Sequence, residues 1–253
     1  MEKENQAVNQ GKPLFYREPM ALNREAHSKM RVAKSPKGYA FAAKTHSVIL
    51  APVEFFEACK EYPIIFSTGA DGSVLPIALL GFRADENLMV DSEGNWDARY
   101  IPAYVRRYPF ILSENDTDNL TVCVDQAFDG LYLKKDGEPI FTKEGGYTDF
   151  MKQTMEFLRT FHIQFKNGAP FGAKLQELDL LKPMDALVEL NDGQKFALNG
   201  FSVVDEVKLQ ALSDEELGSL FRPGYLALIY AHLLSLSTMS GLVDRLSHLA
   251  VAA

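Results

Sequence analysis

Apolar residues recur at helical spacing in two long stretches of the chain. Within residues 149–166 the phenylalanines share one helix face: Phe150, Phe157, Phe161 and Phe165. Asn167-Gly168 and Pro170 then predict the end of this helix. A second helix is predicted from Gly224 to about Leu246, and before it Ser213-Asp214-Glu215-Glu216 matches a capping box at a helix start. This second helix is apolar nearly all round at its start, so we expect it at the centre of the core.

Short apolar runs separated by turn residues predict strands between these helices and before them. The clearest runs are residues 48–50, 63–66, 77–82, 88–90, 120–124 and 131–133. Asp192-Gly193 predicts a tight hairpin turn between 187–190 and 195–198. Asn199-Gly200 repeats the pattern before 201–204, which predicts a three-stranded meander there.

The order of these elements indicates the fold class. Strands gather in the middle of the chain, and helices do not alternate with them regularly. We therefore expect an α+β fold, in which a largely antiparallel sheet of short strands packs with two long helices. Residues 1–18 lack periodic pattern and predict a flexible tail, and residues 19–253 are expected to form a single domain.

Composition and charge narrow the function classes. The chain has 253 residues, is 47% hydrophobic and 24% charged, and carries a net charge of −8. These proportions are typical of a soluble globular protein, and the acidic balance argues against nucleic acid as a partner. A local basic cluster comprises Lys29, Arg31, Lys34 and Lys37. A solvated segment is the favoured interpretation of it over a polyanion site.

Cysteine use and hydropathy indicate the compartment. Cys59 and Cys123 are flanked by apolar residues and are expected to be small buried side chains. No Cys/His spacing suggests zinc, and we expect neither metal nor cofactor. The first 11 residues lack the apolar stretch of a signal peptide, and the apolar run 225–236 is shorter than the ~20 residues of a membrane span. A cytoplasmic protein without a membrane span is expected.

Searches for catalytic motifs find no phosphate-binding loop, nucleophile elbow or H-E-x-x-H pattern. The five histidines are isolated in the sequence: His27, His46, His162, His232 and His248. A satisfied core or surface histidine is the favoured interpretation of each. His232 stands out because it lies in the densest apolar helix and must find hydrogen-bond partners if buried.

The most unusual stretch is residues 96–110, which we call the Trp/Tyr/Arg segment. The candidate ligand-binding residues within it are Trp96, Arg99, Tyr100, Tyr104, Arg106, Arg107 and Tyr108. Arginine forks bind carboxylates or phosphates, and tyrosine rings add contact area with a hydroxyl. If residues 102–108 are helical, Tyr104 and Tyr108 share one face. The alternative is that the aromatic rings are core and the arginines pair with the protein's own carboxylates.

Several of these stretches resemble the bacterial SapC family, which differs from the peptide-transporter permease of the same name. The resemblance rests on residues 22–27, 61–66, 87–110, 122–125 and 229–236, and it covers roughly residues 20–245. It carries over no catalytic residue set or cofactor. Family members tend to be encoded near halogenase-like proteins and outer-membrane receptors, which hints at uptake or modification of glycans or peptides.

Three functional hypotheses follow. The first is a non-catalytic binding or accessory protein that recognises a peptide, glycan or partner protein through the Trp/Tyr/Arg segment, in an uptake, modification or surface-layer pathway. The second is an enzyme in which His27, His46 or His232 joins a distant carboxylate or a metal. The third is a scaffold that forms homo-oligomers through the helix that starts at Gly224. We favour the first.

Overall fold

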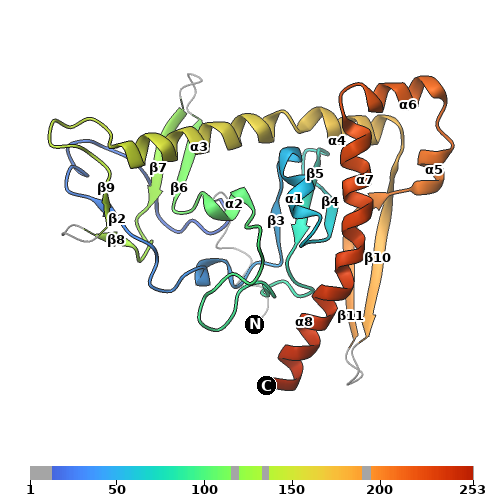
Figure 1. Ribbon diagram of the computed structural model, residues 1–253, viewed down its shortest axis with the longest axis horizontal. Helices are drawn as coiled ribbons and strands as arrows, with labels where there is room; N and C mark the ends of the chain where they lie inside the picture. The colour runs from blue at the N-terminus through green and yellow to red at the C-terminus, as the bar shows by residue number, and fades with distance from the viewer. Residues whose placement is uncertain (1–12, 115–119, 133–136, 190–194, 253) are drawn as a thin grey trace. The chain divides into compact units, whose positions relative to one another are not determined.

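A computed structural model describes residues 13–114, 120–132, 137–189 and 195–252. The predicted α+β class is confirmed, since helices accompany sheets whose strand pairs are antiparallel (Figure 1). The chain divides into two compact units, each treated by itself below. The first unit comprises Met1–Phe41 and Arg107–Thr160, and the second comprises Ala42–Arg106 and Phe161–Ala253. The expectation of a single domain from residue 19 onward stays a prediction.

The first unit contains two three-stranded antiparallel sheets. One sheet has the order β1 (Pro19–Ala21), β7 (Leu120–Asp125), β6 (Phe110–Glu114). The other has the order β8 (Leu131–Tyr132), β2 (Arg31–Val32), β9 (Glu138–Pro139). Because β2 pairs with both β8 and β9, residues near position 30 come beside residues near position 140.

Helix α3 (Asp149–Lys166) confirms the helix predicted from the phenylalanine spacing. Its first turn is capped by the Thr148 hydroxyl, which accepts a hydrogen bond from the Met151 amide at 3.3 Å. Met151 and Leu158 on the inner face of α3 pack into the core of the first unit. The other buried residues of that core are Met30, Val32, Phe110, Val122, Val124, Phe128, Ile140 and Phe141.

The packed structure of the first unit reaches back to at least Pro13, within the predicted tail. Tyr16 is 3% exposed, and its hydroxyl donates to the Phe110 carbonyl at 2.6 Å. The next two amides, of Arg17 and Glu18, donate to the Asp125 carboxylate. Residues 1–12 of the predicted tail lie outside the described residues.

The second unit is built on a five-stranded antiparallel sheet. Its order is β10 (Leu181–Glu189), β11 (Lys195–Val204), β4 (Ile64–Thr68), β5 (Val74–Leu79), β3 (Ser47–Ile49). Its α-helices are α1 (Phe55–Ala58), α2 (Ala103–Arg106), α4 (Ala169–Glu177), α5 (Glu206–Gln210), α6 (Asp214–Phe221), α7 (Tyr225–Ser235) and α8 (Met239–Ala252). Its short 3₁₀ turns are η2 (Pro52–Glu54) and η3 (Leu236–Thr238), and η1 (Ala40–Ala42) spans the boundary at Phe41.

Two local expectations from the sequence are confirmed. The Ser213 hydroxyl and the Glu216 carboxylate form the predicted capping box at the start of α6. Both cysteines are free and buried, as expected, although Cys123 belongs to the first unit.

The predicted three-stranded meander is wrong. The strands β10 and β11 pair as expected, and the Asp192-Gly193 turn itself lies outside the described residues. However, β11 continues through Asn199-Gly200 as one strand. Two residues of β11 there face the single position 185 of β10, and Gly200 has a φ of +83°. Asn199-Gly200 is therefore a β-bulge, which needs the same left-handed glycine as a tight turn.

The last long helix is less buried than expected. One side of α7 is fixed to the sheet, because the buried His232 ring bonds to the Ile64 carbonyl at 2.7 Å and to the Val204 amide at 3.0 Å. The opposite side is open, since Tyr230 is 58% and Leu234 65% exposed. Among the described residues, Tyr225–His248 is one helix whose length and composition would suffice to cross a membrane, a test that core helices also pass. The prediction of a central core helix is thus wrong for its outer face.

Candidate functional site

The first part of the Trp/Tyr/Arg segment is tied into the second unit by an aromatic hydrogen-bond chain. Trp96 is 9% exposed, and its indole nitrogen donates to the Tyr62 hydroxyl at 2.8 Å. The Tyr62 hydroxyl in turn donates to the Tyr100 carbonyl. Burial raises the pKa of Tyr62, which keeps this hydroxyl a donor. Trp96 therefore acts as a core residue in this structure.

The next residues of the segment are hydrogen-bonded to Glu54. Its carboxylate is buried and accepts hydrogen bonds from the Tyr100 hydroxyl at 2.8 Å and the Ala103 amide at 2.7 Å. The Ala51 amide donates to its other oxygen at 2.8 Å. Burial and the Glu54 charge raise the pKa of Tyr100. Tyr104 is also buried, with its ring edge-on to Phe161 at 6.4 Å.

The arginines at this end of the segment are exposed instead. Arg99 and Arg106 both lie at the surface of the second unit. The Arg106 Nε donates to the Ile101 carbonyl at 2.9 Å, and its guanidinium lies 5.7 Å from the centre of the Tyr100 ring. These two side chains remain accessible to a ligand.

Arg107 and Tyr108 belong to the first unit. The Arg107 guanidinium lies 5.9 Å from the centre of the buried Tyr16 ring. The Tyr108 ring stacks on Phe41 with centroids 4.2 Å apart, and its hydroxyl donates to Asp125 at 3.1 Å. Burial and the Asp125 charge raise the pKa of Tyr108.

The seven candidate residues therefore do not share one exposed face. Helix α2 ends at Arg106, so the helix imagined over residues 102–108 is shorter and leaves out Tyr108. Trp96 and Tyr104 are buried, which agrees with the alternative that the aromatic rings of the segment belong to the core. Ligand binding through the remaining, more exposed residues of the segment stays a prediction.

Each histidine that was a candidate for catalysis bonds to the backbone near it. The His27 Nδ1 accepts from the Asn23 amide at 2.8 Å, and the His46 Nδ1 lies 3.2 Å from the Ala84 carbonyl oxygen. His232 is fully buried between two backbone groups, and burial lowers its pKa to about 4. Within the described residues, no three His, Cys, Asp or Glu side chains group as a metal site.

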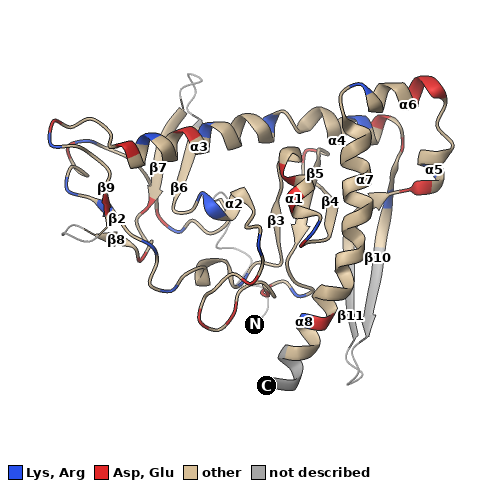
Figure 2. Ribbon diagram, viewed as in Figure 1, with Lys and Arg blue, Asp and Glu red and all other residues tan. Residues whose placement is uncertain are grey.

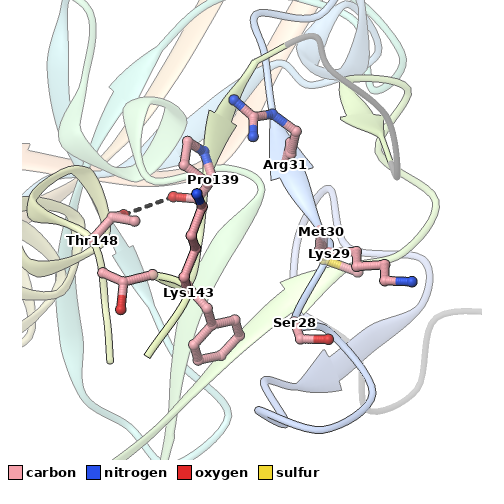
Figure 3. Close-up of a pocket in the computed structure, with 9 residues that line it drawn as sticks. Ser28, Lys29, Met30, Arg31, Pro139, Lys143 and Thr148 are labelled. Carbon is pink, nitrogen blue, oxygen red and sulfur yellow. Dashed lines mark hydrogen bonds between the residues drawn. The ribbon is translucent and has the colours of Figure 1, made fainter. Parts of the chain in front are cut away.

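A basic pocket of about 340 Å³ opens in the first unit. In Figure 3, residues 28–31 run along one side of it, and Pro139, Lys143 and Thr148 lie along the other. The two sides are held together by the pairing of Arg31 with Pro139 and by the Ile140 amide, which donates to the Met30 carbonyl at 3.2 Å. We call this cavity the 28–31/139–148 pocket.

A tight loop brings Lys143 to the rim of this pocket. Phe141 and Tyr147 form an antiparallel bridge, and the Thr142 amide donates to the Gly146 carbonyl at 2.7 Å. The loop is further held by Arg24, whose guanidinium donates to the Glu144 carbonyl at 2.7 Å. Lys143 therefore stands on a braced hairpin.

The lining combines cations, hydroxyls and an apolar floor. The cations are Lys29, Arg31 and Lys143. The hydroxyls are Ser28, Thr142 and Thr148, and the apolar groups are Met30, Pro139 and Phe141. No carboxylate is among the residues described as lining it. Such a lining concentrates positive charge in a chain with a net charge of −8, which favours an anionic ligand.

Carboxylates do stand outside the lining of the 28–31/139–148 pocket. Glu144 follows Lys143 in the loop, and hydrogen bonds from its own amide and from the Thr142 hydroxyl lower its pKa. Asp149 pairs with Lys152 at 2.9 Å on α3. Arg31 is anchored at the pocket by its Nε, which donates to the Gly137 carbonyl at 2.9 Å. Neither of these two carboxylates is among the residues that line the pocket.

Sequence reasoning reached only part of this pocket. Lys29 and Arg31 were recognised as a basic cluster, but the favoured interpretation was a solvated segment. Lys34 and Lys37 of that cluster do not line the pocket. Lys143 was missed, because only the pairing of β2 with β9 brings it near position 30. No local spacing in the sequence carries that signal.

Comparison with known proteins supports one relationship. The sequence model of the SapC family matches residues 22–242, which is most of the chain. No curated protein matches the chain, and no solved structure does. The expected resemblance is therefore confirmed, and the chain belongs to the SapC family.

Proposed function

We propose that this SapC-family protein is a non-catalytic binding or accessory protein that recognises an anionic group on a peptide or glycan. The observation that carries the proposal is the 28–31/139–148 pocket, whose lining combines three cations with apolar side chains. Arginine and lysine bind carboxylate, sulfate and phosphate groups, and hydroxyls add hydrogen bonds to them. A volume of about 340 Å³ lies within the range of small-ligand sites.

The geometry favours binding over the enzyme alternative. The pocket offers donors and positive charge, which orient an anion. The histidines of the enzyme hypothesis instead hydrogen-bond to backbone groups: His27, His46 and His232. A part in an uptake, modification or surface-layer pathway, and a place in the cytoplasm, belong to this proposal as expectations.

The test uses amide NMR spectra of the ¹⁵N-labelled full chain at constant ionic strength. Sodium phosphate, sulfate, acetate and glucuronate are titrated separately against a chloride reference. We expect saturable shifts in the amides of residues 28–31 and 139–148 with at least one anion. The ranking of the anions then identifies which acidic group the pocket prefers.

Charge-reversal variants make this test specific. Lys143→Glu should weaken binding by roughly tenfold or more, because it replaces attraction at the rim with repulsion. Lys37→Glu is the matched control: it changes the net charge equally, but Lys37 is exposed and outside the lining. Equal losses in the two variants, or shifts that never saturate with any of the four anions, would overturn the proposal.

A further inference from the structure

Arg24 does not line the 28–31/139–148 pocket, but it contacts the loop that forms one side of it. Its guanidinium donates to the Glu144 carbonyl at 2.7 Å, one residue after Lys143. This hydrogen bond goes to the backbone of Glu144, whereas the Glu144 carboxylate accepts from its own amide and from the Thr142 hydroxyl. Arg24 therefore holds the main chain beside Lys143.

Gly145 leaves the space that the Arg24 guanidinium occupies. Gly145 has a φ of +81°, and a Cβ at this position would overlap the guanidinium. Any side chain at position 145 would thus push Arg24 away from the Glu144 carbonyl. The arginine and the glycine are matched in shape as well as joined by a hydrogen bond.

Arg24 itself stands on a turn that is fixed to the first unit. The Asn23 side-chain oxygen accepts from the Glu25 amide at 2.8 Å, which is the pattern of an Asx turn. Just before this turn, the Leu22 amide donates to the Val122 carbonyl of β7 at 2.8 Å. From the turn the chain runs directly into one side of the pocket, so Arg24 links that side to the opposite loop.

The two sides of the pocket are therefore joined at two places. At the first, β2 pairs with β9 through Arg31 and Pro139. At the second, Arg24 reaches the loop at Glu144. Lys143 lies in the chain between these two connections. A cation on a backbone that is already ordered loses little conformational freedom when it binds an anion, and this strengthens the complex.

We infer that Arg24 is a positioning residue of the anion site, which holds the loop so that Lys143 meets the ligand at a fixed place. The inference rests on the proposed function, because it assigns a part in binding the same anion. The alternative is that Arg24 contributes only positive charge, as any nearby cation would. The hydrogen bond to a backbone carbonyl and the glycine beneath the guanidinium favour the positioning role, since a contribution from charge alone requires neither.

Two variants separate position from charge. Arg24→Ala removes both the charge and the connection, whereas Gly145→Asn keeps the charge and displaces the guanidinium. Asparagine is chosen because it tolerates a positive φ better than most residues do. Phosphate, sulfate, acetate and glucuronate are titrated separately into each ¹⁵N-labelled full chain at constant ionic strength. Each variant should weaken binding by about fivefold, and the double variant should bind no more weakly than either single one.

A double-mutant cycle tests whether Arg24 acts through Lys143. In a Lys143→Ala background, the further change Arg24→Ala should weaken binding by less than about twofold, because the loop no longer carries the cation that Arg24 positions. A role confined to the stability of the fold would weaken binding equally in both backgrounds. Arg159→Ala is the matched control, since Arg159 is an exposed arginine of the same unit outside the lining. It should leave the affinity unchanged.

The outcomes distinguish this inference from the proposed function. A native chain that responds saturably to none of the four anions would overturn the proposed function and the positioning role together. A native chain that binds, with Gly145→Asn binding equally well, would overturn the positioning role alone. So would additive losses from Arg24→Ala and Lys143→Ala, or equal losses from Arg24→Ala and Arg159→Ala. The cycle requires no change at the glycine, so it decides the inference even if Gly145→Asn disturbs the loop.

Discussion

Two buried carboxylates hold the two ends of the Trp/Tyr/Arg segment, one in each unit. In the second unit, Glu54 accepts a hydrogen bond from the Tyr100 hydroxyl and others from two backbone amides. In the first unit, the fully buried Asp125 accepts from the Tyr108 hydroxyl and also from backbone amides. The same arrangement, a carboxylate that accepts hydrogen bonds from a tyrosine hydroxyl and from backbone N–H groups, therefore occurs twice.

The two carboxylates differ in what they connect. Glu54 joins the turn that begins at Ala51 to the chain near Ala103. Asp125 joins β7 to the amides of Arg17 and Glu18, which precede it by more than 100 residues. A buried carboxylate can thus either brace a local turn or fix a whole terminal segment. We therefore expect the order of the N-terminal segment to depend on Asp125.

Removing Asp125 is the strongest test of this difference. Asp125→Ala leaves several part-buried donors without their acceptor, and we expect it to lower the free energy of unfolding by about 3–5 kcal/mol. Urea unfolding measures that loss, and hydrogen exchange should show fast exchange at the amides of Arg17 and Glu18. Tyr108→Phe, which removes a single donor and keeps the ring, should cost only about 1 kcal/mol.

Glu54→Ala is the counterpart in the other unit. It should leave exchange at residues 17 and 18 unchanged, because Glu54 accepts no hydrogen bond from them. Fast exchange at those two amides in Glu54→Ala would remove the distinction between a local brace and a terminal anchor.

His232 is a third buried titratable group. Unlike the two carboxylates, it binds its backbone partners in the neutral state. Burial lowers its pKa from 6.5 to about 4. The unfolded chain therefore takes up a proton below pH 6.5 that the folded chain refuses until about pH 4. Its contribution to stability is complete above pH 6.5 and falls as the pH drops, by about 2 kcal/mol between pH 6.5 and pH 5.

Unfolding in urea at pH 7, 6 and 5 measures this dependence. His232→Gln removes the titrating ring, so the variant should lose less stability over this interval than the native chain, although it starts from a lower value at pH 7. Parallel curves for the two proteins would show that another group controls the acid side of the stability profile.

The local parts of the fold were predictable from sequence. Four phenylalanines at helical spacing identified α3, and Ser213 with Glu216 identified the start of α6. Both signals act within one or two turns of chain. Asn199-Gly200 was misread because a left-handed glycine serves a tight turn and a β-bulge equally well. Only the pairing partner decides between the two.

The candidate site could not be predicted in the same way. The 28–31/139–148 pocket depends on pairing between strands that lie more than 100 residues apart. Burial within the Trp/Tyr/Arg segment depends on Glu54 and Asp125, which lie outside it. The open face of α7 was missed because an apolar sequence does not reveal how many sides of a helix its neighbours cover. Each of these features is a product of long-range packing.

The smallest expected effects on stability concern Arg106 and Arg107, two adjacent arginines that belong to different units. Arg106→Ala should change the free energy of unfolding by no more than about 0.5 kcal/mol, because the side chain is exposed. Arg107→Ala should cost about 1 kcal/mol, since its guanidinium covers the ring of the buried Tyr16. Thermal unfolding with Arg99→Ala as an exposed control measures both.

Equal losses at the two arginines would mean that exposure does not distinguish them. A loss confined to Arg107 would leave Arg106 and Arg99 as the arginines of the segment at which ligand capture can be tested without disturbing the fold.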